Sequence, residues 1–119
     1  MKRGVHIGPP LVPLRIPSGW LISFNQFTEA NPDLFIDDDY KYKWDFNEDI
    51  FQFKNSFRKR ILDLSWRPAF NPNGEYILVL VDANTLFWNP PLSEFRSRDI
   101  SKIVEMTEFW LLEVSNGNL

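Results

Sequence analysis

The residues of this chain that could do chemistry gather between Asn31 and Asp49. Residues 31–50, here called the acidic segment, contain seven carboxylates and two lysines, which gives this stretch a formal charge of −5. Carboxylates held close together repel one another and cost stability unless a cation relieves them. We therefore expect the acidic segment to bind something that carries positive charge. The carboxylates belong to Asp33, Asp37, Asp38, Asp39, Asp45, Glu48 and Asp49.

Aromatic residues alternate with charged residues in the acidic segment. Lys41 and Lys43 separate the rings of Tyr40, Tyr42 and Trp44. Large rigid rings supply contact area at low entropic cost, so this composition is typical of a recognition surface. The sequence predicts a surface with the rings at its centre and the carboxylates paired to lysines and arginines of a basic protein. The predicted partner-binding residues are Asp37, Asp38, Asp39, Tyr40, Tyr42, Trp44, Asp45, Glu48 and Asp49.

A metal ion is the other cation that Asp37, Asp38 and Asp39 could bind. Calcium loops space their ligands at alternate positions and bend at a glycine. This chain has no glycine between Gly19 and Gly74. We therefore expect no metal and no other cofactor, and a small metal-dependent hydrolase stays an alternative.

Enzyme chemistry finds little support elsewhere in the sequence. The single histidine, His6, lies close to the prolines near the chain start and is a poor base for a nucleophilic triad. The chain has no cysteine and its five glycines are scattered, which excludes thiol catalysis and Gly-rich phosphate-binding loops. We predict that the protein is not an enzyme.

A basic run follows the acidic segment. Residues 54–60 carry a charge of +4 with Phe57 among them, a composition that resembles a nucleic-acid patch. The pI of about 5.1 and the neighbouring acidic segment oppose phosphate binding. We expect the basic run to lie beside the acidic segment and partly neutralise it, and we expect no nucleic-acid partner.

Hydrophobic periodicity predicts the elements that position these residues. Apolar residues at every second position indicate strands, and the turn at residues 71–74 predicts a hairpin between two of them. Asp99 or Ser97 can cap a helix that has an apolar stripe. The expected strands cover residues 20–28, 34–36, 40–44, 49–53, 61–67, 76–81 and 92–96, and the expected helix covers 100–114. The pattern over 49–53 also fits a short helix, although it favours a strand.

These elements predict an α+β fold, an antiparallel β-sheet with a C-terminal α-helix packed on one face. At 119 residues we expect a Pro-rich N-terminal arm over residues 1–18 and a single α+β domain over 19–119. No apolar run reaches the ~18 residues that span a bilayer. With no cysteine either, we expect a cytoplasmic protein without a membrane partner, present as a monomer or weak homo-oligomer.

An ordered set of aromatic and turn motifs gives the chain a family resemblance. The motifs occupy residues 16–20, 25–27, 62–68, 70–74, 88–92 and 110–111. Across residues 16–114 the chain resembles small bacterial immunity proteins of contact-dependent growth inhibition and polymorphic-toxin systems. The resemblance implies a cytosolic protein that binds and neutralises a cognate toxin domain, often a basic nuclease, by covering its active site or an adjacent surface.

A structural or assembly subunit is the alternative from a different class. In this interpretation Phe35, Phe87 and Trp88 are exposed and form a hydrophobic self-interface.

Overall fold

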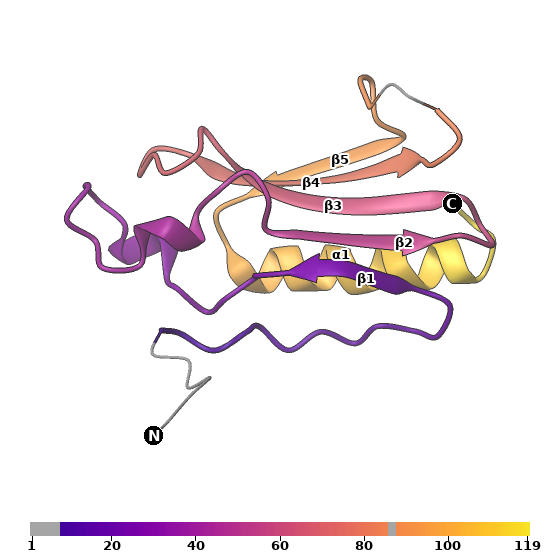
Figure 1. The fold of residues 1–119 in the computed structure, drawn as a ribbon, viewed down its shortest axis with the longest axis horizontal. Helices are drawn as coiled ribbons and strands as arrows, with labels where there is room; N and C mark the ends of the chain where they lie inside the picture. Colours follow the sequence, from indigo (N-terminus) through magenta and orange to yellow (C-terminus); the bar gives the residue numbers. More distant parts are fainter. Residues whose placement is uncertain (1–7, 86–87) are drawn as a thin grey trace.

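The computed structural model describes residues 8–85 and 88–119. Within them, five consecutive strands form an antiparallel sheet whose spatial order equals the chain order, and one α-helix follows (Figure 1). The predicted α+β class, with a C-terminal helix on one face of an antiparallel sheet, is confirmed. The elements are β1 (Leu21–Asn25), β2 (Phe51–Asn55), β3 (Arg60–Arg67), β4 (Glu75–Asp82), β5 (Ser93–Ser97) and α1 (Ile100–Ser115).

The hairpin of β3 and β4 forms the centre of the sheet. The two strands pair without a register shift from Arg60↔Asp82 to Arg67↔Glu75, as the predicted hairpin requires. In their turn, the indole Nε1 of Trp66 donates a hydrogen bond to a carbonyl at 2.9 Å. A Cβ at Gly74 would collide with this same ring. The glycine therefore allows the turn to close over the indole.

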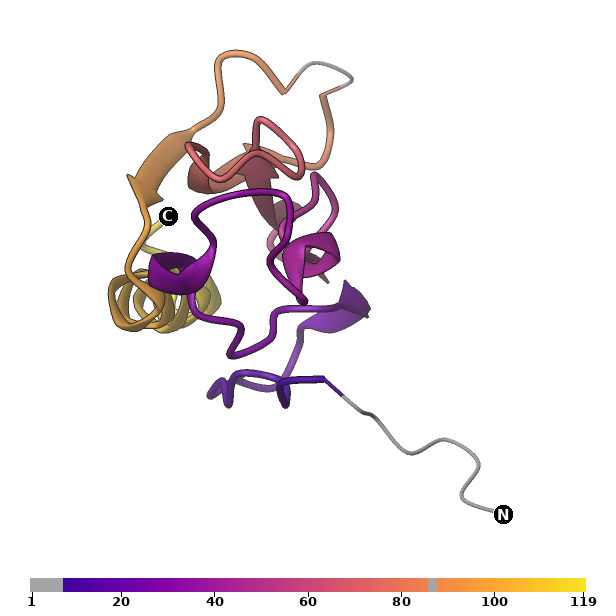
Figure 2. The ribbon, with the colours of Figure 1, turned by 90° about the vertical axis from the view of Figure 1, so that its left-hand side faces the viewer.

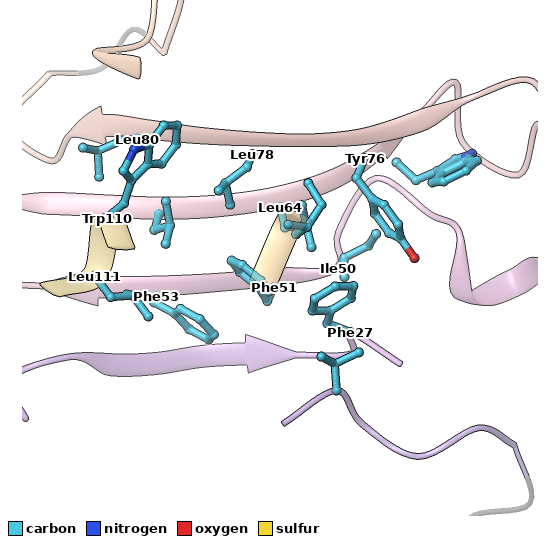
Figure 3. Packing of buried hydrophobic residues seen from close by; sticks show 14 of the residues in the cluster. Phe27, Ile50, Phe51, Phe53, Leu64, Tyr76, Leu78, Leu80, Trp110 and Leu111 are labelled. Atoms are coloured by element: carbon cyan, nitrogen blue, oxygen red, sulfur yellow. The ribbon is translucent and has the colours of Figure 1, made fainter. Parts of the chain in front are cut away.

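The helix α1 packs on one face of the sheet and contacts β4 and β5. Asp99 caps its first turn as predicted, since its Oδ1 accepts a hydrogen bond from the Ser101 N–H at 2.9 Å. An apolar stripe along α1 faces the rings and leucines of the sheet and forms the core with them (Figure 3). The buried members of the stripe are Ile103, Thr107, Trp110, Leu111 and Val114.

The proline-rich residues before β1 pack on the rest of the fold. The Val12 N–H donates to the Phe27 carbonyl at 2.8 Å. The Arg15 N–H donates to a carboxylate oxygen of Glu108 on α1 at 2.7 Å. Residues 8–20 therefore run alongside β1 and α1 (Figure 1), and residues 1–7 lie outside the described residues.

The opposite face of the sheet has no α-helix over it among the described residues. Side chains alternate between the two faces of a strand, and Leu62 and Leu64 point into the core below α1. Asp63 therefore points to the other side, which we call the open face. Its cross-strand neighbours there are Gln52 on β2 and Val79 on β4. The open face is thus a mixed polar and apolar surface.

Candidate partner-binding surface

The acidic segment connects β1 to β2 at one end of the sheet, which faces the viewer in Figure 2. It contains two short 3-10 helices, η1 (Pro32–Leu34) and η2 (Lys43–Asp45). The strands predicted over residues 34–36 and 40–44 are therefore wrong. Asn31, Asp37 and Asn47 each accept a hydrogen bond from the backbone N–H two residues further on. Such local side-chain bonds compete with strand pairing and turn the chain instead.

Two buried rings anchor the acidic segment to the core. Phe35 and Phe46 are each 1% exposed. They stack with 4.9 Å between ring centroids, and Phe46 meets Trp66 of β3 edge-on at 4.6 Å. The prediction that Phe35 is exposed for a self-interface is therefore wrong, because its ring belongs to the core. Phe87, also predicted for that interface, lies outside the described residues.

Arg98, between β5 and α1, fixes η1 against the sheet. Its guanidinium donates to the Pro32 carbonyl of η1 at 3.1 Å and to the Pro72 carbonyl at 3.0 Å, and also to the Gly74 carbonyl. It lies 5.1 Å from the centroid of the Trp66 ring. One cation thus joins η1 to the β3–β4 turn. Sequence reasoning missed Arg98, because its acceptors come from segments far away in the chain.

Asp37, Asp38 and Asp39 lie in the exposed bend between η1 and η2. The Oδ1 of Asp37 accepts the Asp39 N–H at 2.9 Å. No lysine or arginine of the described residues forms an ion pair with any of these three carboxylates. Their charge is therefore uncompensated by direct ion pairs in the part of the chain that the structure describes.

The two lysines of the acidic segment contact rings. The Nζ of Lys43 lies 4.8 Å from the centroid of Trp44, and the Nζ of Lys41 lies 5.4 Å from that of Tyr42. An ammonium group over a ring face is attracted by the ring quadrupole. Both lysines therefore contact ring faces, and neither forms an ion pair with a carboxylate of the bend.

The three predicted rings differ in what they offer a partner. Tyr40 and Tyr42 are half-buried. Tyr40 stacks on Phe35 at 5.7 Å and meets Tyr42 edge-on at 5.7 Å, and desolvation raises the pKa of Tyr40. Trp44 is 63% exposed and meets Phe70, which is 39% exposed, edge-on at 5.0 Å. Trp44 is thus the predicted ring most accessible to a partner, and Phe70, which sequence reasoning missed, extends it.

The other predicted carboxylates lie nearer to the sheet. The Oδ2 of Asp45 accepts a hydrogen bond from the Thr28 hydroxyl at 2.7 Å and so supports the fold of the segment. Glu48 pairs with Arg67 of β3 at 3.4 Å, but the side chains are 60% and 57% exposed. A pair so open to water contributes only about 0–1 kcal/mol. Asp49 is exposed, two residues before β2 begins. The predicted carboxylates therefore fall into three places: the bend, the Thr28 side of the segment for Asp45, and the edge of the open face for Glu48 and Asp49.

A groove on the open face begins where the acidic segment ends. Asp63 of β3 lies in it, half-buried, and accepts a hydrogen bond from Gln52 Nε2 at 3.3 Å. Burial raises the pKa of Asp63 to about 6, and the charge of Asp49 adds to this rise while the Gln52 hydrogen bond opposes it. Sequence alternation places Asp63 on the face opposite the core without showing what surrounds it there. The groove lining includes Glu48, Asp49, Gln52, Asp63, Arg67 and Trp88.

The basic run of residues 54–60 lies around the far end of β2 from the acidic segment (Figure 1). Residues 51–53 of β2, each rising about 3.3 Å, separate the two charged segments, and the rest of the run turns from β2 into β3 at the far end of the sheet. Arg58 donates to the Ser115 carbonyl at the end of α1, at 3.1 Å. The expectation that this run lies beside the acidic segment and neutralises it is therefore wrong.

The described residues contain neither a metal-binding cluster nor a membrane-spanning helix. No cluster of three or more histidine, aspartate or glutamate side chains that could hold a metal ion occurs among residues 8–85 and 88–119. His6, the weak candidate for a base, lies outside them. No helix of the described chain combines the length and apolar character needed to cross a membrane.

Comparisons of the chain with protein-family models, with curated proteins and with solved structures find no match.

Proposed function

We propose that this protein is a cytoplasmic immunity protein that binds and neutralises a cognate basic toxin domain, foremost a nuclease, through the acidic segment. One observation carries the proposal. The carboxylates of Asp37, Asp38 and Asp39 are exposed, and no lysine or arginine of the described residues pairs with them. The sequence resemblance to immunity proteins is the reason for expecting this partner to be a toxin domain.

Charge and rings have separate tasks in this proposal. The carboxylates of the bend attract a cationic partner during diffusion, which raises the association rate at low ionic strength. Trp44 and Phe70 then supply apolar contact area, and such aromatic anchors carry most of the affinity at protein interfaces. Bound at this end of the sheet, the chain prevents the toxin from reaching its substrate by covering the active site or a surface next to it.

The test begins with capture of the partner from cells of the native host. The tagged wild-type chain is compared with the triple variant Asp37→Asn, Asp38→Asn, Asp39→Asn. The matched control removes three charges from α1 by Glu105→Gln, Glu108→Gln and Glu113→Gln; each glutamine keeps one side-chain oxygen, which can still accept the hydrogen bonds from Arg15 and Asn118. We expect the wild type and the control to retain the same basic protein, and the triple Asn variant to retain much less of it.

Association kinetics with the captured protein then test the mechanism. We expect the triple Asn variant to associate more slowly at low salt and to show a shallower dependence of the rate on salt. If its rate and salt dependence equal those of the wild type, the bend is not the binding site. If the captured protein is acidic, or has no effect on cells that lack this chain, the proposed function is wrong.

A further inference from the structure

The strand β5 is a free edge of the sheet in the described chain. It pairs with β4 over all five residues, from Ser93 to Ser97, without a register shift. In Figure 2 it lies at the outer margin of the molecule, above α1. Such an edge presents backbone N–H and C=O groups to which another strand can pair.

The other edge of the sheet is less suited to strand addition. The register of β1 with β2 shifts between Ile22 and Phe24. Just after β1, the N-terminal arm pairs with the chain through the bridge Leu11↔Thr28. Irregular and flanked edges accept a further strand poorly. Of the two edges, β5 is therefore the one open to a partner strand.

The charge pattern of β5 is complementary to that of a second, antiparallel copy of β5. Glu94 and Arg96 point to the open face on either side of Phe95, and their side chains are 41% and 51% exposed. Within one chain Arg96 pairs with Glu94 at 2.9 Å and with Glu75 at 3.5 Å, so association of two copies would add cross-strand partners to an exposed ion-pair network. If two β5 strands pair antiparallel about Phe95, Glu94 of each copy lies opposite Arg96 of the other. Opposite charges that face each other across two strands attract. Charged residues on an edge strand prevent pairing only when the facing residues carry the same sign. A second copy of this chain therefore fits the charge pattern of the edge.

The helix side of β5 adds an apolar surface to the same edge. Phe95 and Phe109 line a groove between β5 and α1, and the ring of Phe109 is 55% exposed. Lys102 and Glu105, of opposite charge, also line it. In the antiparallel arrangement about Phe95, the two Phe95 rings meet and each groove faces its counterpart. Pairing would thus bury rings on one face of the joined sheet and form ion pairs on the other.

We propose that two copies of this chain associate through antiparallel pairing of β5 about Phe95, which joins two five-stranded sheets into one of ten strands. The bend of Asp37–Asp39 lies outside this interface, whereas Glu94 and Arg96 line the open-face groove together with Glu48 and Asp49 at the end of the acidic segment. The dimer therefore presents two acidic segments, and its formation does not depend on the proposed function.

Sedimentation velocity of the pure full-length chain tests this interface. The wild type is expected to shift from 14.1 kDa toward twice this mass as its concentration rises. Arg96→Glu places glutamates opposite each other twice in the dimer, and Glu94→Arg does the same with arginines. Each is expected to weaken dimerisation about tenfold or more. Lys54→Glu, an equal charge change on an exposed strand residue of β2, is the matched control and should leave dimerisation unchanged.

Variants that exchange the two charges distinguish dimerisation through β5 from self-association through another surface. The double variant Glu94→Arg with Arg96→Glu should dimerise again, and a mixture of the two single variants should form a heterodimer. Phe109→Asp leaves the charges of β5 intact and should weaken dimerisation independently. Circular dichroism of each variant serves as the control for folding. A wild type that stays monomeric at about 1 mM overturns the proposal. A dimer that both single charge variants leave intact overturns it as well.

Discussion

Asp63→Asn is expected to stabilise the protein at neutral and alkaline pH and to leave its stability unchanged in acid. The pKa of Asp63 is 3.8 in an unfolded chain and about 6 in the fold, because burial penalises the charged form. Below pH 3.8 the carboxyl is protonated in both states. Between pH 3.8 and 6 the unfolded chain releases its proton while the folded chain keeps it, so the free energy of unfolding falls as pH rises. Above pH 6 this loss is complete.

The size of the effect follows from the two pKa values. One pKa unit corresponds to about 1.4 kcal/mol, so the separation of 3.8 from about 6 amounts to roughly 3 kcal/mol. Asparagine has the same shape without the charge, and its oxygen can still accept the hydrogen bond from Gln52. The variant should therefore recover up to roughly 3 kcal/mol at pH 8 and nothing at pH 3.5.

Urea denaturation at intervals between pH 3.5 and 8 measures this difference. Asp38→Asn serves as the control, because its side chain is exposed and its replacement should change stability by less than about 0.5 kcal/mol at pH 8. If Asp63→Asn differs from the wild type by the same amount at both ends of the pH range, or is less stable at pH 8, the reasoning is refuted. A confirmed effect also bears on recognition, since a lysine or arginine of a partner placed in the groove would relieve the same cost.

Three further substitutions separate packing from recognition. Phe46→Ala removes a ring that is 1% exposed, and urea denaturation should show a loss of about 3–5 kcal/mol; a loss below about 1 kcal/mol contradicts its anchoring role. Thr107→Val removes a buried hydroxyl that has no hydrogen-bond partner in the described residues, so we expect a gain of about 1–3 kcal/mol, and a lower melting temperature contradicts this. Trp44→Ala, which removes a ring that is 63% exposed, should cost less than about 1 kcal/mol of stability and weaken partner capture at least tenfold, and undiminished capture argues against Trp44 as an anchor.

Local patterns were sufficient to predict the sheet and the helix. The strands expected at residues 49–53, 61–67, 76–81 and 92–96 correspond to β2, β3, β4 and β5. Side-chain alternation follows directly from strand geometry, and the cap at Asp99 involves a residue only two positions away. Such features need no knowledge of distant segments.

The same alternation was misleading in the acidic segment. Tyr40, Tyr42 and Trp44 occupy every second position, yet the chain turns there, and only Trp44 is largely exposed. Phe35 and Phe46 stack on each other, and Phe46 packs against Trp66 of β3. These contacts, together with the side-chain hydrogen bonds of the turns, outweigh a weak preference for strand.

The sequence by itself determined how much negative charge the acidic segment carries and that rings accompany it, because composition and order are local properties. Only the tertiary structure decided which of these residues a partner can reach. It placed most of the basic run around the far end of β2 from the acidic segment, and the bend stays unpaired in the described chain. It also set Asp63 in a groove beside Asp49. Burial and the distance between charges depend on segments that meet only after folding, and they decide whether a charge is compensated.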